Sequence, residues 1–545
     1  MPPARGRMHS EPDRLIGGGG TMPVIGEAVG SQAAAAAAQR GTAGSADPLP
    51  APDGDRPGQP PARRPRPGRA TSRLPRLPRW ARLADTPSRL RGMLAGVLVL
   101  TVVFGLVCWR ADSGAQSTWT TVTGSQAPQV IDAGALYQAL TDQDAQTANI
   151  LVDGSDPTLA ANRVTALKTY TADRISADRA LQAATLSAAG NTAVQNALAD
   201  VLDGMGGYDD LAARAMELNE HAGAGSGHPD PAALTEYRQA TDLMQGTLLP
   251  AANRLLNADN AAFDDGYDTR RADLSTAEVW TAVLGGLLLL SLLGLQLWLL
   301  RRYRRIVNPP LAAATLLAVL LLGLACSLYP AERTQLHTAR RDAFDSVVAL
   351  DRARAVSYDA NADESRYLLD QDRRAQYQQS FFNDSQQLAD LAPADSVFTY
   401  DAPLQAAVSD YRADHARIDF GGYLGAEFHN ITFTGERAAA EATLTAYQKY
   451  QLDDRHLRSL VGSGQLGAAI AYNTSLAPGG SNADFALYDA ALTKVIGIND
   501  AAYAKAAHDG SSELSERLPL LLAGSFVTVL LCLLGGRPRL AEYRR

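Results

Sequence analysis

The sequence lacks the residue patterns on which most enzymes depend. Its 545 residues contain no HExxH pair, no GxSxG elbow and no kinase signature. The glycine-rich stretch at residues 223–227 is without the lysine that follows a phosphate-binding loop, so we interpret it as a connection between helices. We therefore predict a protein that is not an enzyme and holds no cofactor.

Cysteine and histidine are also scarce. The three cysteines, Cys108, Cys326 and Cys532, lie in or beside apolar runs, and no CxxC spacing occurs. The eight histidines are scattered, whereas a structural metal site needs several ligands that converge. Neither disulfides nor a bound metal are expected to hold the fold together, and no nucleic-acid partner is expected.

Charged residues are missing from the interiors of four apolar runs, at residues 93–109, 279–300, 311–329 and 518–534. Gln296 is the only strongly polar residue in the second run. Transporters and proton relays place ionisable side chains at mid-membrane, because coupling ions need partners there. The lack of such residues argues against a transport function.

The four runs do have the length that a membrane requires. A helix needs about 20 apolar residues to cross a bilayer, and even the short first run spans roughly 25 Å at about 1.5 Å per residue. We interpret this first run as an uncleaved anchor, because the tail before it is far longer than the basic region of a signal peptide. We predict four transmembrane helices.

Arginines set the predicted orientation. Four of them surround Tyr303 in the turn at residues 301–310, and others flank the first run and occupy residues 535–545. Short basic segments stay on the cytoplasmic side of a membrane. We predict a multi-pass plasma-membrane protein with both termini in the cytoplasm and two large outer segments, residues 111–277 and 330–517.

The N-terminal tail, residues 1–91, is low in complexity and rich in glycine, alanine, proline and arginine. Such a composition cannot bury enough apolar surface to offset the entropy of ordering, so we predict disorder. Its arginine-rich end would be attracted to anionic lipid of the inner leaflet. The alternative is that these arginines only fix the topology.

Both outer segments carry apolar residues at spacings of three and four, which is typical of amphipathic helices. Clusters of Gly, Pro, Asp and Ser mark the expected breaks, at residues 153–157, 204–207 and 222–231, near Asp370, near Pro393 and at residues 477–480. A less regular, aromatic-rich piece occupies residues 420–435. Four helices per segment fit these breaks, so the predicted fold is an all-α membrane protein with two extracytoplasmic helical bundles.

The two outer segments look like copies of each other. Aligning residues 142–153 with residues 359–370 pairs Asp142 with Asp359 and Asp153 with Asp370. At the far ends, Asn260-Ala-Ala-Phe pairs with Asp500-Ala-Ala-Tyr, at a similar distance before the next span. We predict a duplicated unit of span, four-helix bundle and span, whose two bundles pack on each other as an intramolecular pseudo-dimer.

Helical bundles joined directly to membrane spans resemble the four-helix sensor domains of chemoreceptors and sensor kinases. In such receptors a shift of one helix relative to another passes through the span. Residues 301–311 resemble the entrance to a HAMP linker, with basic residues before Pro310-Leu311. The chain departs from that pattern by re-entering the membrane at once, so cytoplasmic output is expected from a separate protein.

The four spans, the two outer bundles and the turn RRYRRIVNPP resemble the actinobacterial four-span membrane proteins of the GlnX family. The resemblance covers roughly residues 90–545 and leaves the N-terminal tail unexplained. It implies that a solute-binding lipoprotein for aspartate or glutamate signals through this protein to the cytoplasmic Ser/Thr kinase PknG. The implied function is a non-enzymatic relay of amino-acid status.

Two groups of residues are candidates for functional sites. The residues assigned to a cytoplasmic partner are Arg301, Arg302, Tyr303, Arg304 and Arg305. The residues assigned to an outer ligand or partner are Asp142, Asn149, Asp359 and Arg366. Two other functions stay open: a scaffold of the cell envelope, and a direct sensor that holds a small polar molecule between bundle helices near Asn149 and Arg366.

Overall fold

The computed structural model of the chain describes residues 86–187, 192–303 and 308–541. Most of the predicted disordered tail lies outside these ranges, but its last residues, from Thr86 onward, are helical. Helices are the only regular elements in the described ranges, so the all-α prediction is confirmed.

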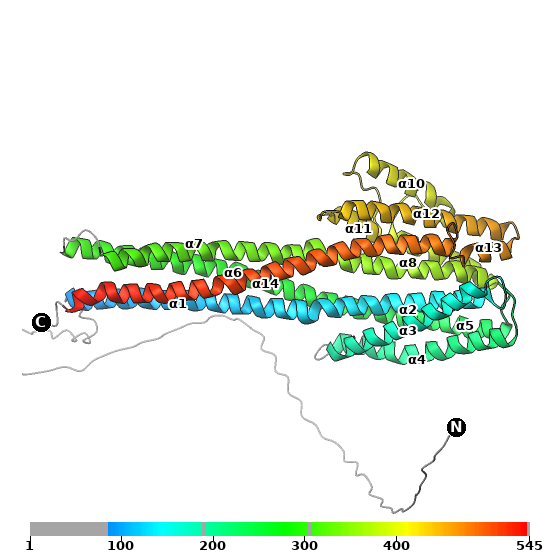
Figure 1. Cartoon of the computed structure of the whole chain (residues 1–545), viewed down its shortest axis with the longest axis horizontal. Helices are drawn as coiled ribbons and strands as arrows, with labels where there is room; N and C mark the ends of the chain where they lie inside the picture. Colours follow the sequence, from blue (N-terminus) through cyan, green and yellow to red (C-terminus); the bar gives the residue numbers. More distant parts are fainter. Residues whose placement is uncertain (1–85, 188–191, 304–307, 542–545) are drawn as a thin grey trace, which may run out of the picture. The chain divides into compact units, whose positions relative to one another are not determined.

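Four long helical stretches form the frame of the molecule (Figure 1). In each of the first three, helices follow one another without a loop: α1 (Thr86–Thr121), η2 (Val122–Gln126) and α2 (Ala127–Asp153); α5 (Pro231–Leu243), η3 (Met244–Leu248) and α6 (Leu249–Tyr303); α7 (Pro309–His337), η4 (Thr338–Phe344) and α8 (Asp345–Leu369). The fourth is the single helix α14 (Ser481–Ala541). The η2, η3 and η4 segments are π-helical turns within otherwise α-helical stretches.

Each of these four stretches contains a segment long and apolar enough to cross a membrane. In these segments α1 packs on α6 and α14, and α7 packs on the same two helices. Leucines such as Leu292 and Leu311 fill the space between them, whereas Leu290 and Leu320 point outward and are more than half exposed. Outward-facing leucine is what a lipid environment favours, so the chain is a multi-pass membrane protein.

The shorter helices lie in two bundles, which we call the first bundle (residues 111–277) and the second bundle (residues 330–517). The first bundle adds α3 (Ala160–Ser187) and α4 (Thr192–His221) to the long stretches. The second adds η5 (Gln371–Arg373), α9 (Arg374–Leu388), α10 (Val397–Ala413), α11 (Gly422–Asn430), α12 (Glu436–Gly462) and α13 (Leu466–Asn473).

The break expected at residues 204–207 is wrong, because these residues lie inside α4. Each glycine in a helix costs about 1 kcal/mol relative to alanine, and tertiary packing outweighs that cost here. A Cβ atom at Gly204 would lie 2.8 Å from Cδ2 of Leu248. The glycine therefore lets α4 approach the η3 turn closely.

The second bundle is more elaborate than four helices. The stretch at residues 420–435, expected to be less regular, holds the short helix α11. Its Phe428 ring packs edge-on against Tyr411 and against Phe420. These rings close the side of the bundle next to α10, so the aromatic residues serve the core.

The structure supports the duplication through two features that the sequence alignment did not use. The π-helical turns η2 and η4 fall at corresponding places when Asp142 is aligned with Asp359. In the same register, α2 ends at Asp153 and α8 ends just before Asp370.

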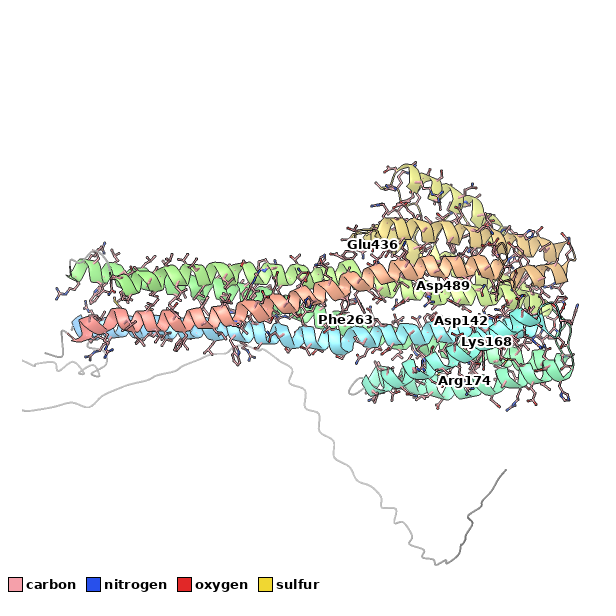
Figure 2. The ribbon with its side chains drawn as sticks, in the orientation of Figure 1. Asp142, Lys168, Arg174, Phe263, Glu436 and Asp489 are labelled. Carbon is pink, nitrogen blue, oxygen red and sulfur yellow. The ribbon has the colours of Figure 1, made fainter. Side chains whose placement is uncertain are left out.

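The two bundles meet along α2 and α8, which pack side by side. Figure 2 marks Asp142 of the first bundle and Asp489 of the second on the two sides of this interface. Further along the chain toward the spans, the Trp119 indole donates to Glu332 across the halves at 2.6 Å.

Candidate functional site

Buried charge is concentrated where α2 meets α8. The Arg366 guanidinium of α8 donates to Asp144 of α2 through Nη2, and through Nη1 to Asp359 at 2.9 Å and Asp363 at 2.6 Å. Arg366 and Asp144 are fully buried. This buried ion pair joins the two bundles. Removing either partner would leave an unpaired buried charge, which strongly destabilises the fold.

The carboxylates around Arg366 outnumber the positive charge. Burial raises the pKa of Asp363 to about 7, although Arg366 opposes the shift. Burial, with the neighbouring Asp359 and Asp363, also raises the pKa of Asp384 well above its ordinary value. Near neutral pH, the negative charge of these carboxyl groups is therefore balanced partly by Arg366 and partly by bound protons.

Hydroxyl groups complete the contacts of Asp144. Tyr208 of α4 donates to its Oδ1 atom at 2.8 Å, and the Tyr208 hydroxyl lies 3.0 Å from that of Thr147. Asn149, one turn further along α2, accepts a hydrogen bond from Ser365 of α8 at 2.6 Å. Polar contacts thus continue along the face of α2 that looks toward the second bundle.

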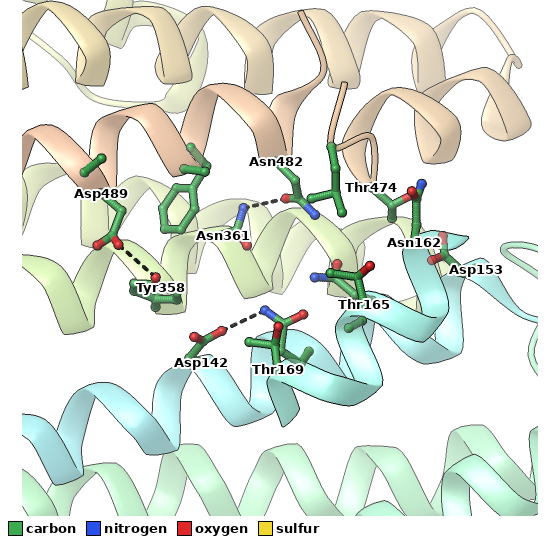
Figure 3. Close-up of a pocket in the computed structure, with 17 residues that line it drawn as sticks. Asp142, Asp153, Asn162, Thr165, Thr169, Tyr358, Asn361, Thr474, Asn482 and Asp489 are labelled. Atoms are coloured by element: carbon green, nitrogen blue, oxygen red, sulfur yellow. Dashed lines mark hydrogen bonds between the residues drawn. The ribbon is translucent and has the colours of Figure 1, made fainter. Parts of the chain in front are cut away.

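A cavity of about 220 Å³ opens between α2 and α3 on one side and α8 and α14 on the other, and we call it the first cavity. Asp142, Asn149 and Asp153 line it from α2. Across it, Asn361 donates to Asn482 at 3.1 Å and Tyr358 donates to Asp489 at 3.2 Å (Figure 3). Its volume suits a small metabolite rather than a larger cofactor.

Two acids in the first cavity hold protons tightly. Burial raises the pKa of Asp142 to about 6, although Gln146 donates to its carboxylate at 2.7 Å. Burial raises the pKa of Asp153 to about 7, although the positive charge of Arg163 acts in the opposite direction. Burial therefore destabilises their charged forms.

A second cavity, of about 370 Å³, lies on the other side of α8, between η3 and α9. Asp242 and Gln245 line it from α5 and η3, and Asp363 and Arg366 line it from α8. Gln245 also donates to Asp359 at 2.7 Å. Arg366 therefore occupies the wall of this second cavity with its own positive charge.

The sequence analysis missed a buried arginine near the membrane. Arg340 in η4 pairs with Asp264 of α6 at 2.8 Å and with Asp345 at 2.7 Å. Its guanidinium also lies over the Phe263 ring, 4.8 Å from the centroid. The sequence carries no clear signal for it, because Arg340 lies in the mostly polar stretch at residues 335–345, beyond the apolar run.

A third buried cluster, also missed, lies inside the second bundle. Arg458 of α12 pairs with Asp454 at 2.8 Å and lies over the Tyr367 ring. Burial, with Asp454 close by, raises the pKa of Glu364 well above its ordinary value. Spacing of four residues between Asp454 and Arg458 suggested only a surface pair, so burial could not be foreseen.

The structure brings the four outer candidate residues together at one interface. Asp142 and Asn149 line the first cavity, and Arg366 lines the second while it pairs with Asp359. No group of three or more His, Cys, Asp and Glu side chains in the described ranges is placed to hold a metal ion.

The cytoplasmic candidates lie at the end of α6. Arg301 and Arg302 occupy its last turn and are exposed. Tyr303 ends the helix, and Arg304 and Arg305 lie outside the described residues. The structure therefore places only the beginning of the basic turn.

Four helices long and apolar enough to cross a membrane, together with a buried polar interface between two bundles, define an all-α membrane protein. A family model described as an actinobacterial sensor domain matches residues 118–268, the greater part of the first bundle. No curated protein and no solved structure matches the chain. The match indicates a sensing or signalling role.

Proposed function

We propose that this protein relays a nutrient signal across the plasma membrane to a separate cytoplasmic kinase, without chemistry of its own. The observation that carries the proposal is helical continuity. The stretches Ser88–Asp153, Pro231–Arg302, Pro309–Leu369 and Ser481–Pro538 each run from the bundles through an apolar segment. A displacement of one stretch at the interface of the bundles is therefore transmitted to the opposite end.

The π-helical turns supply the places where such a displacement can begin. A π turn inserts an extra residue into an α-helix and is often found at functional sites. The η4 turn holds the buried Arg340, which bonds to Asn260 of α6 at 2.9 Å. This contact couples the second bundle to a helix of the first just outside the membrane.

The partners are proposed from the resemblance to the GlnX family. An aspartate- or glutamate-binding lipoprotein would dock on the bundles, and a PknG-type kinase would contact the basic turn after α6. Arg301 and Arg302 are exposed at that helix end, which supports a partner contact there. The orientation assumed is the one set by arginine, with both termini in the cytoplasm.

Copurification tests the relay. The full chain is solubilised from its native membrane after mild crosslinking, and the bound proteins are identified. Replacing Arg301, Arg302, Arg304 and Arg305 with alanine is expected to remove the kinase and to leave membrane insertion intact. Replacing Arg89 and Arg91 with alanine is the control, because it removes basic residues on the same predicted side without touching the turn.

Recovery of envelope-assembly proteins in place of a kinase and a binding lipoprotein would favour the scaffold function instead. Undiminished recovery of the kinase with the fourfold variant would remove the basic turn as its contact.

Direct sensing is a second candidate function, and the first cavity specifically favours it. This cavity lies between the two bundles, so a molecule bound in it contacts both. A ligand that favours one arrangement of the bundles shifts the equilibrium between arrangements by its difference in affinity. A lipoprotein and a small molecule are therefore compatible inputs to one relay.

A further inference from the structure

The two cavities occupy corresponding places in the duplicated halves. The first is formed by α2 and α3 with α8 and α14; the second is formed by α8 and α9 with α5 and η3. In the alignment of α2 with α8, Gln146 and Asn149 of the first cavity correspond to Asp363 and Arg366 of the second. Part of the wall of the first cavity therefore has its counterpart in the wall of the second.

The last helical stretch of each half shows the same correspondence between the cavities. The alignment of Asn260 with Asp500 pairs Asp242 with Asn482, and each of these two residues lines its own cavity. Gln245 and Phe485 form a further pair of this kind. Corresponding wall positions can thus be compared one by one.

The second cavity carries its own positive charge. Arg366 reaches Asp359 and Asp363 from within its wall. Outside the cavity wall, in the same half, Arg238 donates through Nε to Asp370 at 2.7 Å, and Arg373 lies 3.9 Å from the same carboxylate. The acids of this half are therefore matched by guanidinium groups from the chain itself.

The first half has no counterpart of these cations at the aligned positions. The position of Arg366 is taken by Asn149, that of Arg238 by Pro478 and that of Arg373 by Asp156. The acids remain, because Asp142 corresponds to Asp359 and Asp153 to Asp370. The wall residues of the first cavity include three acids and no lysine, arginine or histidine.

Nearby cations only partly compensate. Arg354 lies close to Asp142, but its Nε and Nη2 atoms donate to Asp489, at 2.6 and 2.9 Å. Asp153 is completely buried, and neither of its carboxylate oxygens accepts a hydrogen bond. The hydroxyl of the adjacent Thr474 donates to the Ile470 carbonyl instead. A buried carboxylate without donors is costly, so it calls for a partner from outside.

We propose that the first cavity binds a small organic cation, an amine or a guanidine, whose positive charge takes the place that Arg366, Arg238 and Arg373 hold in the other half. Asp142 and Asp153 receive the charged groups. Asn149 and Gln146 lie between the two acids on the same face of α2 and offer hydrogen bonds to the rest of the molecule.

The spacing of the two acids favours an elongated ligand. Asp142 and Asp153 are separated by three turns of α2, which at about 1.5 Å per residue is roughly 16 Å along the axis. A linear cation with charged groups near both ends suits this spacing: extended spermidine can reach both acids, whereas the shorter agmatine and putrescine can reach one of them at a time. A dicarboxylate such as glutamate would meet like charge at both ends.

The binding itself stands apart from signalling, but its meaning as an input rests on the proposed relay. Calorimetry of the full chain in nanodiscs, with agmatine, putrescine and spermidine as probes, is the direct test. Saturable binding of at least one of them and none of glutamate is expected. No saturable heat with any of the three overturns the proposal.

Matched variants locate the binding. D153N should raise the dissociation constant at least tenfold. D178N, which removes the same charge from an exposed position on α3, should leave it unchanged. N149R installs the arginine of the other half and should abolish binding; N149A, which removes the amide without adding charge, should retain it within about fivefold. Equal affinity of wild type, D153N and N149R would place the cation elsewhere.

Melting curves of all four variants guard against misfolding as the cause of lost binding. D153N is expected to melt no lower than wild type, since it removes an unsatisfied buried charge. If the chain binds the cation but the fourfold arginine variant still recovers the kinase, the relay through the basic turn is contradicted and the cation site stands. If kinase recovery depends on the basic turn but no cation binds, the cation site is contradicted and the relay stands.

Discussion

Arg366 is surrounded by more acid than it can neutralise. Its guanidinium contacts Asp144 of the other bundle and two acids of its own helix. Replacing a buried, paired arginine leaves the carboxylates without a cation, which typically costs about 3–5 kcal/mol. R366M should therefore lower the melting temperature strongly and loosen the contact between the bundles.

Thermal unfolding in detergent, followed by circular dichroism, measures this effect. R179A is the control, because Arg179 is exposed on α3 and should change stability by less than about 0.5 kcal/mol. An R366M protein as stable as R179A would show that the ion cluster contributes nothing to the interface.

Asp153 makes stability depend on pH. Its pKa is raised to about 7 in the folded chain, against about 3.9 for an unfolded aspartate. The folded state therefore binds this proton more tightly, and the resulting stability is present below about pH 4 and is lost as the pH rises through 7. D153N should be more stable than wild type at pH 8, by at least about 1 kcal/mol, and equally stable at low pH.

The groups that face Asp153 are Arg163, Asp156 and Thr474, and none of them changes in this variant. Denaturation at a series of pH values gives the difference between the two proteins directly. A difference that does not grow between pH 5 and 8 would show that Asp153 is already ionised. The same titration predicts that cation affinity increases over this range, because the ligand needs the carboxylate charged.

At the scale of elements, the π-helical turns are the unusual feature. Because a π turn holds one extra residue, deleting one residue within it restores a plain α-helix and keeps the orientation of the residues beyond the turn. Deletion of Gly124 from η2 should leave the bundles folded and the melting temperature within a few degrees of wild type. Coupling between the bundles and the cytoplasmic partner should be lost.

Deletion of Ser117 from α1 is the matched control. It lies in regular α-helix, where losing one residue rotates everything beyond it by about 100°, so this variant should fail to fold. Kinase recovery from membranes reads out the coupling. Full coupling in the Gly124 deletion would show that the turn has no part in transmission.

The elements themselves were largely accessible from the sequence, and the reason is their periodicity. The apolar runs predicted the long stretches, and the turn after Asp153 predicted the end of one of them. That turn needs glycine, because Gly154 adopts a φ of +57°. The helix through Gly204 was not accessible, because only packing against Leu248 explains it. The helices inserted at α10, α11 and α13 were likewise hidden by irregular spacing.

The site was accessible only in part. Asp142, Asn149, Asp359 and Arg366 lie in the aligned segments 142–153 and 359–370, and the helices that carry these segments pack against each other. The Arg340 and Arg458 clusters depend on partners far away in sequence or on burial, which helical periodicity does not encode. The difference in charge between the two cavities could not be predicted, because it depends on how the two halves pack in three dimensions.

At the scale of the whole molecule, the bundles should behave as an intramolecular pair. A Cβ atom built on Gly134 of α2 would lie 3.5 Å from the Cβ atom of Asp351 on α8, within the range for a disulfide. In a background with Cys108, Cys326 and Cys532 replaced by alanine, the pair G134C and D351C should form a disulfide within one chain.

Non-reducing gel electrophoresis distinguishes the outcomes. A band of monomer size with altered mobility, reversed by reductant, is expected; each single cysteine variant should give no such band. Crosslinks confined to dimers would mean that the bundles pair between chains instead.

The unequal cavities have a consequence for how dose translates into response. A receptor assembled from two identical chains offers equivalent sites, and occupancy of one can alter the affinity of the other. Here one half holds a guanidinium in place at Arg366, while the other half would offer Asp153, in the wall of the first cavity, to an exchangeable partner. Each chain would then have one exchangeable site, so its occupancy would follow a simple hyperbola in ligand concentration. The corresponding position in the other half would stay permanently occupied by the chain's own arginine.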